Sequence, residues 1–355
     1  MRQVRWVALA VAFVLLATLT GQAQAETDIE QVVFSVKDLE RSTEVYTAVM
    51  GFRVRERGQG VSAALGRLWS LPPGTEMRWV LMEKAEAPDS IRIQLVQFTP
   101  LAPRARYEYR EQDGGYLDVH LCVADVLSSY KELIAQGFTA MHHPILWRGR
   151  GGELGVGERA WYEAFMHGFD GEGITLIPWQ ERPGCKDLST SLPFGPIRNI
   201  TIAVGNLEEA HRFYTGVLDW GATEKRYDAF GPDMERMLRL PRGAVARAVH
   251  FGPPPIPWLT LVEFAGVPKT DLSARNAPPF RGLSVLSFAV YDIDNLFARM
   301  RAANVHIVMP PIEISERPYG RAKAFTVRGP DGVFMEFAET TRTQTGRRSS
   351  TRGER

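Results

Sequence analysis

The sequence repeats itself, and this repeat limits the possible folds more than any other feature. The segment VVFSVKDLERSTEVYTAVMGF at residues 32–52 aligns with ITIAVGNLEEAHRFYTGVLDW at residues 200–220, at an offset of 168. A weaker pair joins residues 119–138 to residues 286–305. Self-similarity of this kind indicates a fold assembled from copies of one supersecondary unit. The chain therefore contains four related units in two pairs.

Each of the four segments predicts a strand, a short turn and a helix. Apolar side chains occupy every second position on one face of residues 31–36, which is the pattern of a half-buried strand. Asp38, or Asn206 in the later copy, can cap the helix that follows, and Gly51 can end it. Strand-like runs such as RWVLM and IRIQLVQF come next. The repeated unit is therefore a strand, a helix and about three further strands, or βαβββ.

Composition and turn signals divide the chain into two repeated halves. With 355 residues, 45% of them apolar, it is long enough for roughly two ordinary domains. The first pair of units spans residues 29–180 and the second spans residues 196–340, with a Pro-, Gly- and Ser-rich linker at residues 181–195. The tail at residues 341–355 is polar and basic, so we expect it to be disordered. A formal net charge of +1 gives no field that would favour nucleic acid as a partner.

Residues 1–25 have the pattern of a cleavable secretory signal peptide. A basic start, MRQVR, precedes the apolar run WVALAVAFVLLATLT and the small-residue stretch GQAQA. The run is short for a membrane-spanning helix, so cleavage after Ala25 is favoured over a retained membrane anchor. We therefore expect a periplasmic or secreted protein without a membrane attachment after cleavage.

The chain has two cysteines, Cys122 in a predicted strand and Cys185 in the linker. Export implies an oxidising compartment, in which disulfides persist. A disulfide also requires the two Cα atoms to lie within about 7 Å, which the sequence cannot show. We therefore expect two free thiols.

The four βαβββ units, with V-x-D-L-E-x-S at residues 36–42 and GPDGVFMEF at residues 329–337, resemble the vicinal oxygen chelate superfamily. That superfamily includes glyoxalase I, extradiol dioxygenases and the bleomycin resistance proteins. The resemblance implies an α+β fold in which four βαβββ modules pair into two cup-shaped glyoxalase-like domains, at residues 29–180 and 196–340. Whether neighbouring modules pair or modules swap between the halves stays open, as does the oligomeric state.

The resemblance also implies positions for a divalent metal ion. Each module of the family supplies up to two ligands, one in its first strand and one in its last, usually His or Glu, with Gln also used in glyoxalase I. The corresponding positions in this sequence are Gln31, Gln94, Asp118, Thr175, Asn199, Thr260, Val285 and Glu336. None is a histidine, so we expect no metal site of the family type, and the cofactor stays open. If a metal were bound, the family positions to hold it would be Gln31, Gln94, Asp118 and Glu336.

Strand alternation places Asp118 and His120 on one face of a strand in the first cup. A carboxylate beside an imidazole can act as a catalytic acid–base pair, with the carboxylate orienting the ring. A hydrogen bond that only stabilises the sheet is the alternative. The polar residues expected to bind substrate in the same cup are Gln31, Gln94, Thr175 and His167. The second cup, with Val285 and Ala203, has the character of a scaffold.

These observations leave three functions open. The first is an exported glyoxalase-like lyase or isomerase that acts on a small oxygenated compound. The second is a non-catalytic small-molecule-binding protein of the bleomycin resistance type. The third, an extradiol dioxygenase, is disfavoured because it needs two His and a Glu around iron. In each case the expected partner is a small molecule.

Overall fold

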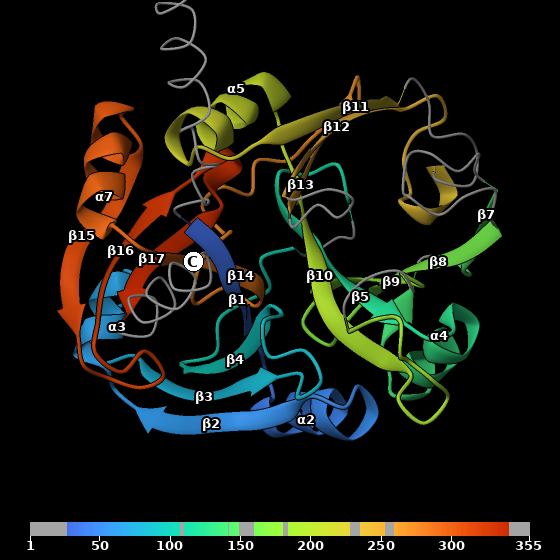
Figure 1. Cartoon of the computed structure of the whole chain (residues 1–355), viewed down its shortest axis with the longest axis horizontal. Helices are drawn as coiled ribbons and strands as arrows, with labels where there is room; N and C mark the ends of the chain where they lie inside the picture. The colour runs from blue at the N-terminus through green and yellow to red at the C-terminus, as the bar shows by residue number, and fades with distance from the viewer. Residues whose placement is uncertain are drawn as a thin grey trace, which may run out of the picture.

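The computed structural model describes residues 27–106, 110–140, 142–148, 160–179, 184–227, 235–252 and 259–340. The predicted signal peptide and the predicted disordered tail lie outside these ranges. Within them, the chain folds into two large mixed sheets of eight and nine strands with helices packed on them (Figure 1). No helix of the described ranges is long and apolar enough to span a membrane. The predicted α+β fold of βαβββ modules is confirmed.

The first sheet joins the first and fourth modules, in the order β15-β16-β17-β14-β1-β4-β3-β2. Its strands from the first module are β1 (Thr27–Ser35), β2 (Arg53–Gly60), β3 (Glu76–Glu83) and β4 (Arg92–Thr99). Its strands from the fourth module are β14 (Gly282–Val290), β15 (His306–Ile314), β16 (Ala322–Arg328) and β17 (Phe334–Thr340). We call the concave side of this sheet cup A; it carries Gln31, Gln94 and Glu336.

The second sheet joins the third and second modules, in the order β11-β12-β13-β10-β5-β9-β8-β6, with β7 paired to β8. Its strands from the third module are β10 (Phe194–Ala203), β11 (Ala222–Tyr227), β12 (Val245–Phe251) and β13 (Leu259–Ala265). Its strands from the second module are β5 (Gly115–Val123), β6 (Thr139–Ala140), β7 (Ile145–Arg148), β8 (Ala160–His167) and β9 (Gly173–Ile177). We call its concave side cup B; it carries Asp118, His120 and Thr175.

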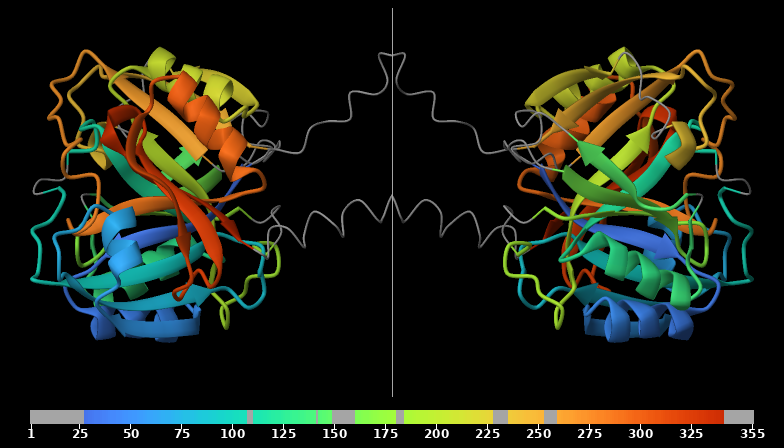
Figure 2. Two further views of the ribbon diagram at one scale, coloured as in Figure 1. Left: turned by 90° about the vertical axis from the view of Figure 1, so that its left-hand side faces the viewer. Right: turned by 90° about the vertical axis from the view of Figure 1, so that its right-hand side faces the viewer.

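The modules therefore pair across the two halves of the sequence. Strand β1 runs antiparallel to β14, and β5 runs antiparallel to β10. The left view of Figure 2 shows the red and orange strands of the fourth module beside the blue elements of the first. Residues 29–180 and 196–340 mark the two copies of the repeat, but each cup takes one module from each half. The sequence left this pairing open, but a first cup shared by Gln31, Gln94, Asp118 and His120 requires neighbouring modules to pair, and it does not form because the central strands of each sheet come from different halves.

Each module's helix begins where the sequence predicts. The helices are α2 (Leu39–Glu44), α4 (Val126–Ala135), α5 (Leu207–Arg212) and α7 (Ile293–Ala302), and α2 and α5 continue as π-helical turns at Val45–Val49 and Phe213–Val217. The caps are Asp38, Asp125, Asn206 and Asp292, and each accepts a hydrogen bond from the backbone N–H three residues later. A cap of this kind contributes about 1 kcal/mol to helix stability. The repeated Asp or Asn is therefore a structural signal.

Closing turns tie the two sheets together at equivalent places in each half. Asp170 Oδ2 accepts a hydrogen bond from the backbone N–H of Lys37 at 2.8 Å, and Asp331 Oδ1 accepts one from Gly205 at 2.7 Å. Lys37 and Gly205 hold the same position in the repeat, just after β1 and β10. Within each half, the closing turn that belongs to one sheet thus braces the first strand–helix turn of the other sheet.

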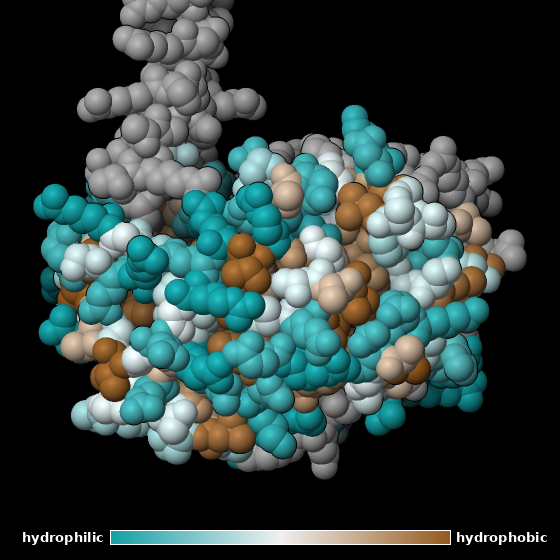
Figure 3. All heavy atoms as spheres, turned by 90° about the horizontal axis from the view of Figure 1, so that it is seen from below, coloured by the Kyte–Doolittle hydropathy of each residue, from teal (hydrophilic) through white to brown (hydrophobic). Residues whose placement is uncertain are grey.

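One large core lies on the helix side of both sheets and includes Phe34, Leu121, Ile200 and Phe288, which are at most 2% exposed. A second apolar cluster in cup A includes residues of the short helix α3 (Ala63–Leu68), which lies beside β15 and β16 in Figure 1. On the face drawn in Figure 3, apolar side chains are scattered among hydrophilic ones. The apolar surface that builds the fold is thus largely inside.

Cys122 and Cys185 form a disulfide, with their Cα atoms 6.0 Å apart. The expectation of two free thiols is wrong. Strand β10 pairs with β5 so that Phe194 lies opposite Val123. The linker that precedes β10 therefore runs back beside the end of β5 and brings Cys185 to Cys122.

Candidate active site in cup B

Cup B brings Asp118 and His120 together. The two side chains lie on the same face of β5, and Asp118 Oδ1 is 3.3 Å from His120 Nε2. The Asp118 side chain is 5% exposed and that of His120 is 16% exposed, so the pair is sheltered, and a small part of the ring is exposed although its Nδ1 atom is buried. The structure thus has the geometry that an acid–base pair requires, and its catalytic role stays a prediction.

A β-bulge shapes this part of β5. Thr201 of β10 lies opposite Asp118, but the next residue, Ile202, lies opposite Tyr116, so Leu117 is the extra residue in the ladder. Bulges re-aim side chains and are common beside active sites. Here the Thr201 hydroxyl comes to 2.9 Å from His120 Nε2. Two oxygen atoms, from Asp118 and Thr201, therefore face the same ring nitrogen.

The surroundings of Asp118 favour its charged form. Burial raises the pKa of Asp118, but the His120 imidazole and hydrogen bonds from Thr175 and Thr201 outweigh burial, so the pKa lies below its ordinary value. The Thr175 hydroxyl donates to Asp118 Oδ2. A carboxylate at Nε2 favours the tautomer with the proton on that nitrogen. His120 Nδ1 is then the basic atom, and it has no hydrogen-bond partner within the described ranges.

Trp179 and the disulfide hold the imidazole ring from one side. The Trp179 ring stacks on His120 with centroids 5.5 Å apart and an angle of 19° between the planes. Trp179 also packs in a buried cluster with Cys122 and Cys185. The disulfide therefore supports the indole that positions His120.

Glu163 is a further acidic residue in cup B, and the sequence analysis missed it. On β8, Phe165 lies opposite Thr175 of β9, which in turn lies opposite His120, so Glu163 shares their face two residues away. Burial raises the pKa of Glu163, and the charge of Asp118 raises it further, while His120 and two indoles act in the opposite direction. The sequence WYEAFMH could have indicated this, because strand alternation places Glu163 between Trp161 and Phe165 on one face.

The two indoles beside Glu163 belong to Trp147 and Trp161. Strand β7 pairs with β8 so that Trp147 lies opposite Trp161, and Trp161 shares the face of Glu163. Both indoles lower the pKa of Glu163, so both act on its carboxyl group. Both indole nitrogens are buried and act on the Glu163 carboxyl group as donors, but neither reaches normal hydrogen-bond geometry with an acceptor among the described residues.

His167, expected to bind substrate, is engaged elsewhere. Its Nε2 lies 3.1 Å from Glu111 Oε1, and the side chains of the two residues are only 3% and 2% exposed. The Phe165 ring meets the His167 ring edge-on at 4.9 Å. The structure therefore gives His167 a buried carboxylate partner of its own, and a role in substrate binding stays a prediction.

Gln31 and Gln94 do not share a cup with Asp118, contrary to expectation, because they belong to the other sheet. In cup A, Gln31 Nε2 donates to Gln94 Oε1 at 2.7 Å. Glu336 is fully buried and accepts hydrogen bonds from Trp69 Nε1 at 2.7 Å, from Ser287 at 2.7 Å and from the Tyr319 hydroxyl at 2.8 Å. Most of these polar groups bond one another, and Gln94 Nε2 is buried without a hydrogen-bond partner among the described residues.

The residues present do not fit the divalent metal of the family. In cup A the one carboxylate at a family position already accepts from three side chains, and the two amides bond each other. In cup B the family positions supply one carboxylate, Asp118, together with hydroxyl and amide groups, and Asn199 donates to Thr260 at 3.0 Å. Across the described ranges, no three His, Cys, Asp or Glu side chains are grouped so that they could hold a metal ion.

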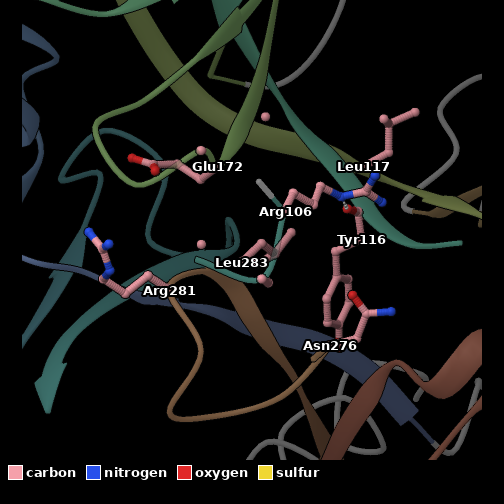
Figure 4. Close-up of a pocket in the computed structure, with 11 residues that line it drawn as sticks. Arg106, Tyr116, Leu117, Glu172, Asn276, Arg281 and Leu283 are labelled. Carbon is pink, nitrogen blue, oxygen red and sulfur yellow. Dashed lines mark hydrogen bonds between the residues drawn. The ribbon is translucent and has the colours of Figure 1, made fainter. Parts of the chain in front are cut away.

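A small pocket also lies where the two sheets meet (Figure 4). Arg106, Tyr116, Glu172, Asn276 and Arg281 line it, but Asp118 and His120 do not. It has room for about one water molecule. We treat it as a structural junction between the sheets.

The chain is similar to known proteins over most of its length. It matches the family model of the Glyoxalase/Bleomycin resistance protein/Dioxygenase superfamily over residues 28–146 and 197–337. It is similar to the solved structure of glyoxalase I from Zea mays, with 14% sequence identity, a TM-score of 0.58 and coverage of 90% of this chain and 95% of that chain. A mutant of the same enzyme gives 14% identity, a TM-score of 0.59 and coverage of 90% and 96%. No curated protein sequence matches significantly.

Proposed function

Because the chain belongs to the Glyoxalase/Bleomycin resistance protein/Dioxygenase superfamily, also called the vicinal oxygen chelate superfamily, we propose that cup B is a small-molecule active site. There the Asp118–His120 pair moves a proton on a small oxygenated compound, in a lyase or isomerase reaction. The contact of 3.3 Å between Asp118 Oδ1 and His120 Nε2 carries this proposal. The likeness to glyoxalase I supports only the fold at this level of identity.

The proposed chemistry follows from the ring's surroundings. Asp118 holds the proton on His120 Nε2, so Nδ1 is free to accept a proton from a carbon next to a carbonyl group. The C–H bond breaks, an N–H bond forms, and the electron pair moves onto the carbonyl oxygen to give an enolate. Return of the proton to a different atom completes an isomerisation, and loss of a leaving group from the enolate completes an elimination. The Asp118 carboxylate stabilises the imidazolium between the two steps.

We also propose that the protein works outside the cytoplasm, in the periplasm or secreted. The basic and apolar leader pattern of residues 1–25 supports this proposal. The disulfide between Cys122 and Cys185 supports it independently, because disulfides persist in oxidising compartments.

Non-catalytic ligand binding is the second candidate function. Trp147, Trp161 and Trp179 surround the acidic groups of cup B, and flat aromatic surfaces of this kind bind ligands without any chemistry. We do not propose an extradiol dioxygenase, because none of the eight family ligand positions holds a histidine.

Exchange of carbon-bound hydrogen for deuterium distinguishes the two candidates. The mature protein is incubated in D₂O with a panel of small ketones, hydroxyketones and ketoacids, and NMR follows loss of the acidic C–H signals. We expect exchange that His120→Gln slows by about 100-fold or more. His250→Gln is the matched control, because His250 lies on β12 of the same sheet and its Nδ1 contacts Thr260 at 3.0 Å. If tryptophan fluorescence shows that a compound binds but NMR shows no deuterium exchange, the catalytic function is rejected and non-catalytic ligand binding remains.

A further inference from the structure

Three polar groups converge on cup B from the β7–β8 hairpin. Trp161 and Glu163 are two residues apart on β8 and share a face, and Trp147 lies directly across from Trp161. The charges of Asp118 and His120 both act on the Glu163 carboxyl group, as do the indoles of Trp147 and Trp161. The hairpin thus presents two indole N–H groups and one carboxyl group toward the Asp118–His120 pair.

These donors lack an acceptor in normal geometry in the part of the chain that the structure describes. The Nε1 atoms of Trp147 and Trp161 are buried and act as donors toward the Glu163 carboxyl group, but neither makes a hydrogen bond of normal geometry there. Buried N–H groups are nearly always paired, so two orphans beside one carboxyl group mark a place where a ligand atom belongs. An oxygen atom of a ligand can accept a hydrogen bond from both donors. His120 Nδ1 is also buried and has no hydrogen-bond partner among the described residues, so it can accept a proton from the ligand.

The protonated form of Glu163 would add a third donor. Burial and the charge of Asp118 raise its pKa, so the carboxyl group holds its proton to higher pH than an exposed one. Among the residues that the structure describes, the charged or titratable groups that act on it are Asp118 of β5 and His120 of the same strand. A neutral carboxyl group in this position donates a hydrogen bond and does not repel a negatively charged oxygen.

We propose that Trp147, Trp161 and Glu163 form an oxygen-binding pocket that holds the carbonyl oxygen of the ligand and stabilises it as an enolate. The ligand is a flat carbonyl compound with an acidic C–H beside the carbonyl group, placed so that this hydrogen faces His120 Nδ1. Donors aimed at a developing oxyanion are a strong source of rate enhancement. This proposal rests on the proposed proton transfer. In it, hydrogen-bond donors bind the ligand oxygen, because the described residues of cup B do not fit a metal ion that could do so.

Binding of 4-nitrophenol tests the pocket without any turnover. Its phenolate resembles an enolate, and its visible absorbance reports both binding and ionisation. We expect the wild-type protein to bind the phenolate, and Trp147→Phe and Trp161→Phe, which keep a ring but remove the N–H, each to weaken binding by about tenfold. Trp220→Phe is the matched control, because its indole N–H donates to Thr27 at 2.7 Å outside cup B. It should change the affinity by less than about twofold.

Glu163→Gln gives a second, pH-dependent readout. Gln keeps an N–H donor at every pH, so we expect wild-type affinity at low pH and tighter phenolate binding than wild type once Glu163 ionises. Equal affinities of wild type, Trp147→Phe and Trp161→Phe would overturn the oxygen pocket, as would no binding to wild type. His120→Gln should retain 4-nitrophenol binding while losing deuterium exchange. Exchange that persists in the wild type while the phenolate fails to bind would therefore reject the pocket and keep the acid–base pair.

Discussion

At the scale of single residues, Glu172 shows how strongly the fold can set a charge. It is 2% exposed, and its Oε2 accepts a hydrogen bond from the backbone N–H of Asp170 at 3.0 Å. Burial, together with the charge of Asp170, raises the pKa of Glu172 to about 8. The carboxyl group therefore carries a proton at neutral pH in the folded protein and loses it in the unfolded chain.

This difference predicts a pH dependence of stability. The folded pKa lies above the unfolded value, so the stabilisation is complete below about pH 4.5 and is lost as pH rises toward 8. In that window the free energy of unfolding should fall by up to about 1.4 kcal/mol per pH unit through this group. Glu172→Gln should flatten that slope in urea titrations, whereas Glu40→Gln, on an exposed side chain, should not. Parallel slopes for wild type and Glu172→Gln would show that Glu172 is ionised in the folded state.

The sequence predicts which residues lie together when they share one strand. It does not predict this when the residues lie on different strands, because their positions then depend on how the strands pair. Asp118 and His120 share a strand, so alternation alone places them on one face. Glu163 lies near them because β8 pairs with β9 and β9 pairs with β5. Gln31 lies in the other cup because β1 pairs with β14. No local sequence pattern predicts either of these strand pairings.

At the scale of elements, the disulfide fixes the linker covalently to strand β5. The Cys122–Cys185 bond closes a loop with a sequence separation of 63 and packs against Trp179, which stacks on His120. The caps and strand alternation were predictable because they are local. The disulfide was not, because it depends on where β10 lies beside β5.

Removing the disulfide should therefore affect both stability and the site. We expect Cys122→Ser with Cys185→Ser to lower the free energy of unfolding by about 2–4 kcal/mol. The variant should also alter the near-ultraviolet circular dichroism of tryptophan, because Trp179 loses its support. A reducing agent should shift the wild-type midpoint in the same direction and leave the variant unchanged. A variant as stable as wild type, with an identical tryptophan signal, would contradict this account.

At the scale of the whole molecule, the two halves depend on each other. The central antiparallel pairs, β1 with β14 and β5 with β10, each take one strand from either half. The repeat predicted four modules, but the pairing stayed open because strand order in a sheet is a nonlocal property. Equivalent turns at Asp170 and Asp331 join the two sheets within each half.

Separated halves should not fold as monomers. A fragment of residues 27–190 keeps both cysteines but exposes the edges of β1 and β5, and residues 191–340 expose β14 and β10. We expect neither fragment to give a cooperative unfolding transition as a monomer, and we expect the two, produced together, to form a one-to-one complex with the circular dichroism of the intact chain. Sedimentation and thermal unfolding measure both results. A stable folded monomer of either fragment would show that a half is self-sufficient.

The exchange of modules between halves also has an evolutionary consequence. A half-length ancestor with this topology could complete its sheets only as a symmetric pair of identical subunits, and any substitution would then appear in both of its cups. Fusion of two copies into one chain removes that constraint, since each cup can now mutate alone. Both cups hold an apolar cluster, but the Glu336 carboxyl group of cup A accepts hydrogen bonds from three side chains, while His120 of cup B stays partly exposed. Under the function proposed above, one duplicated gene carries one cup that supports the fold beside one that performs chemistry.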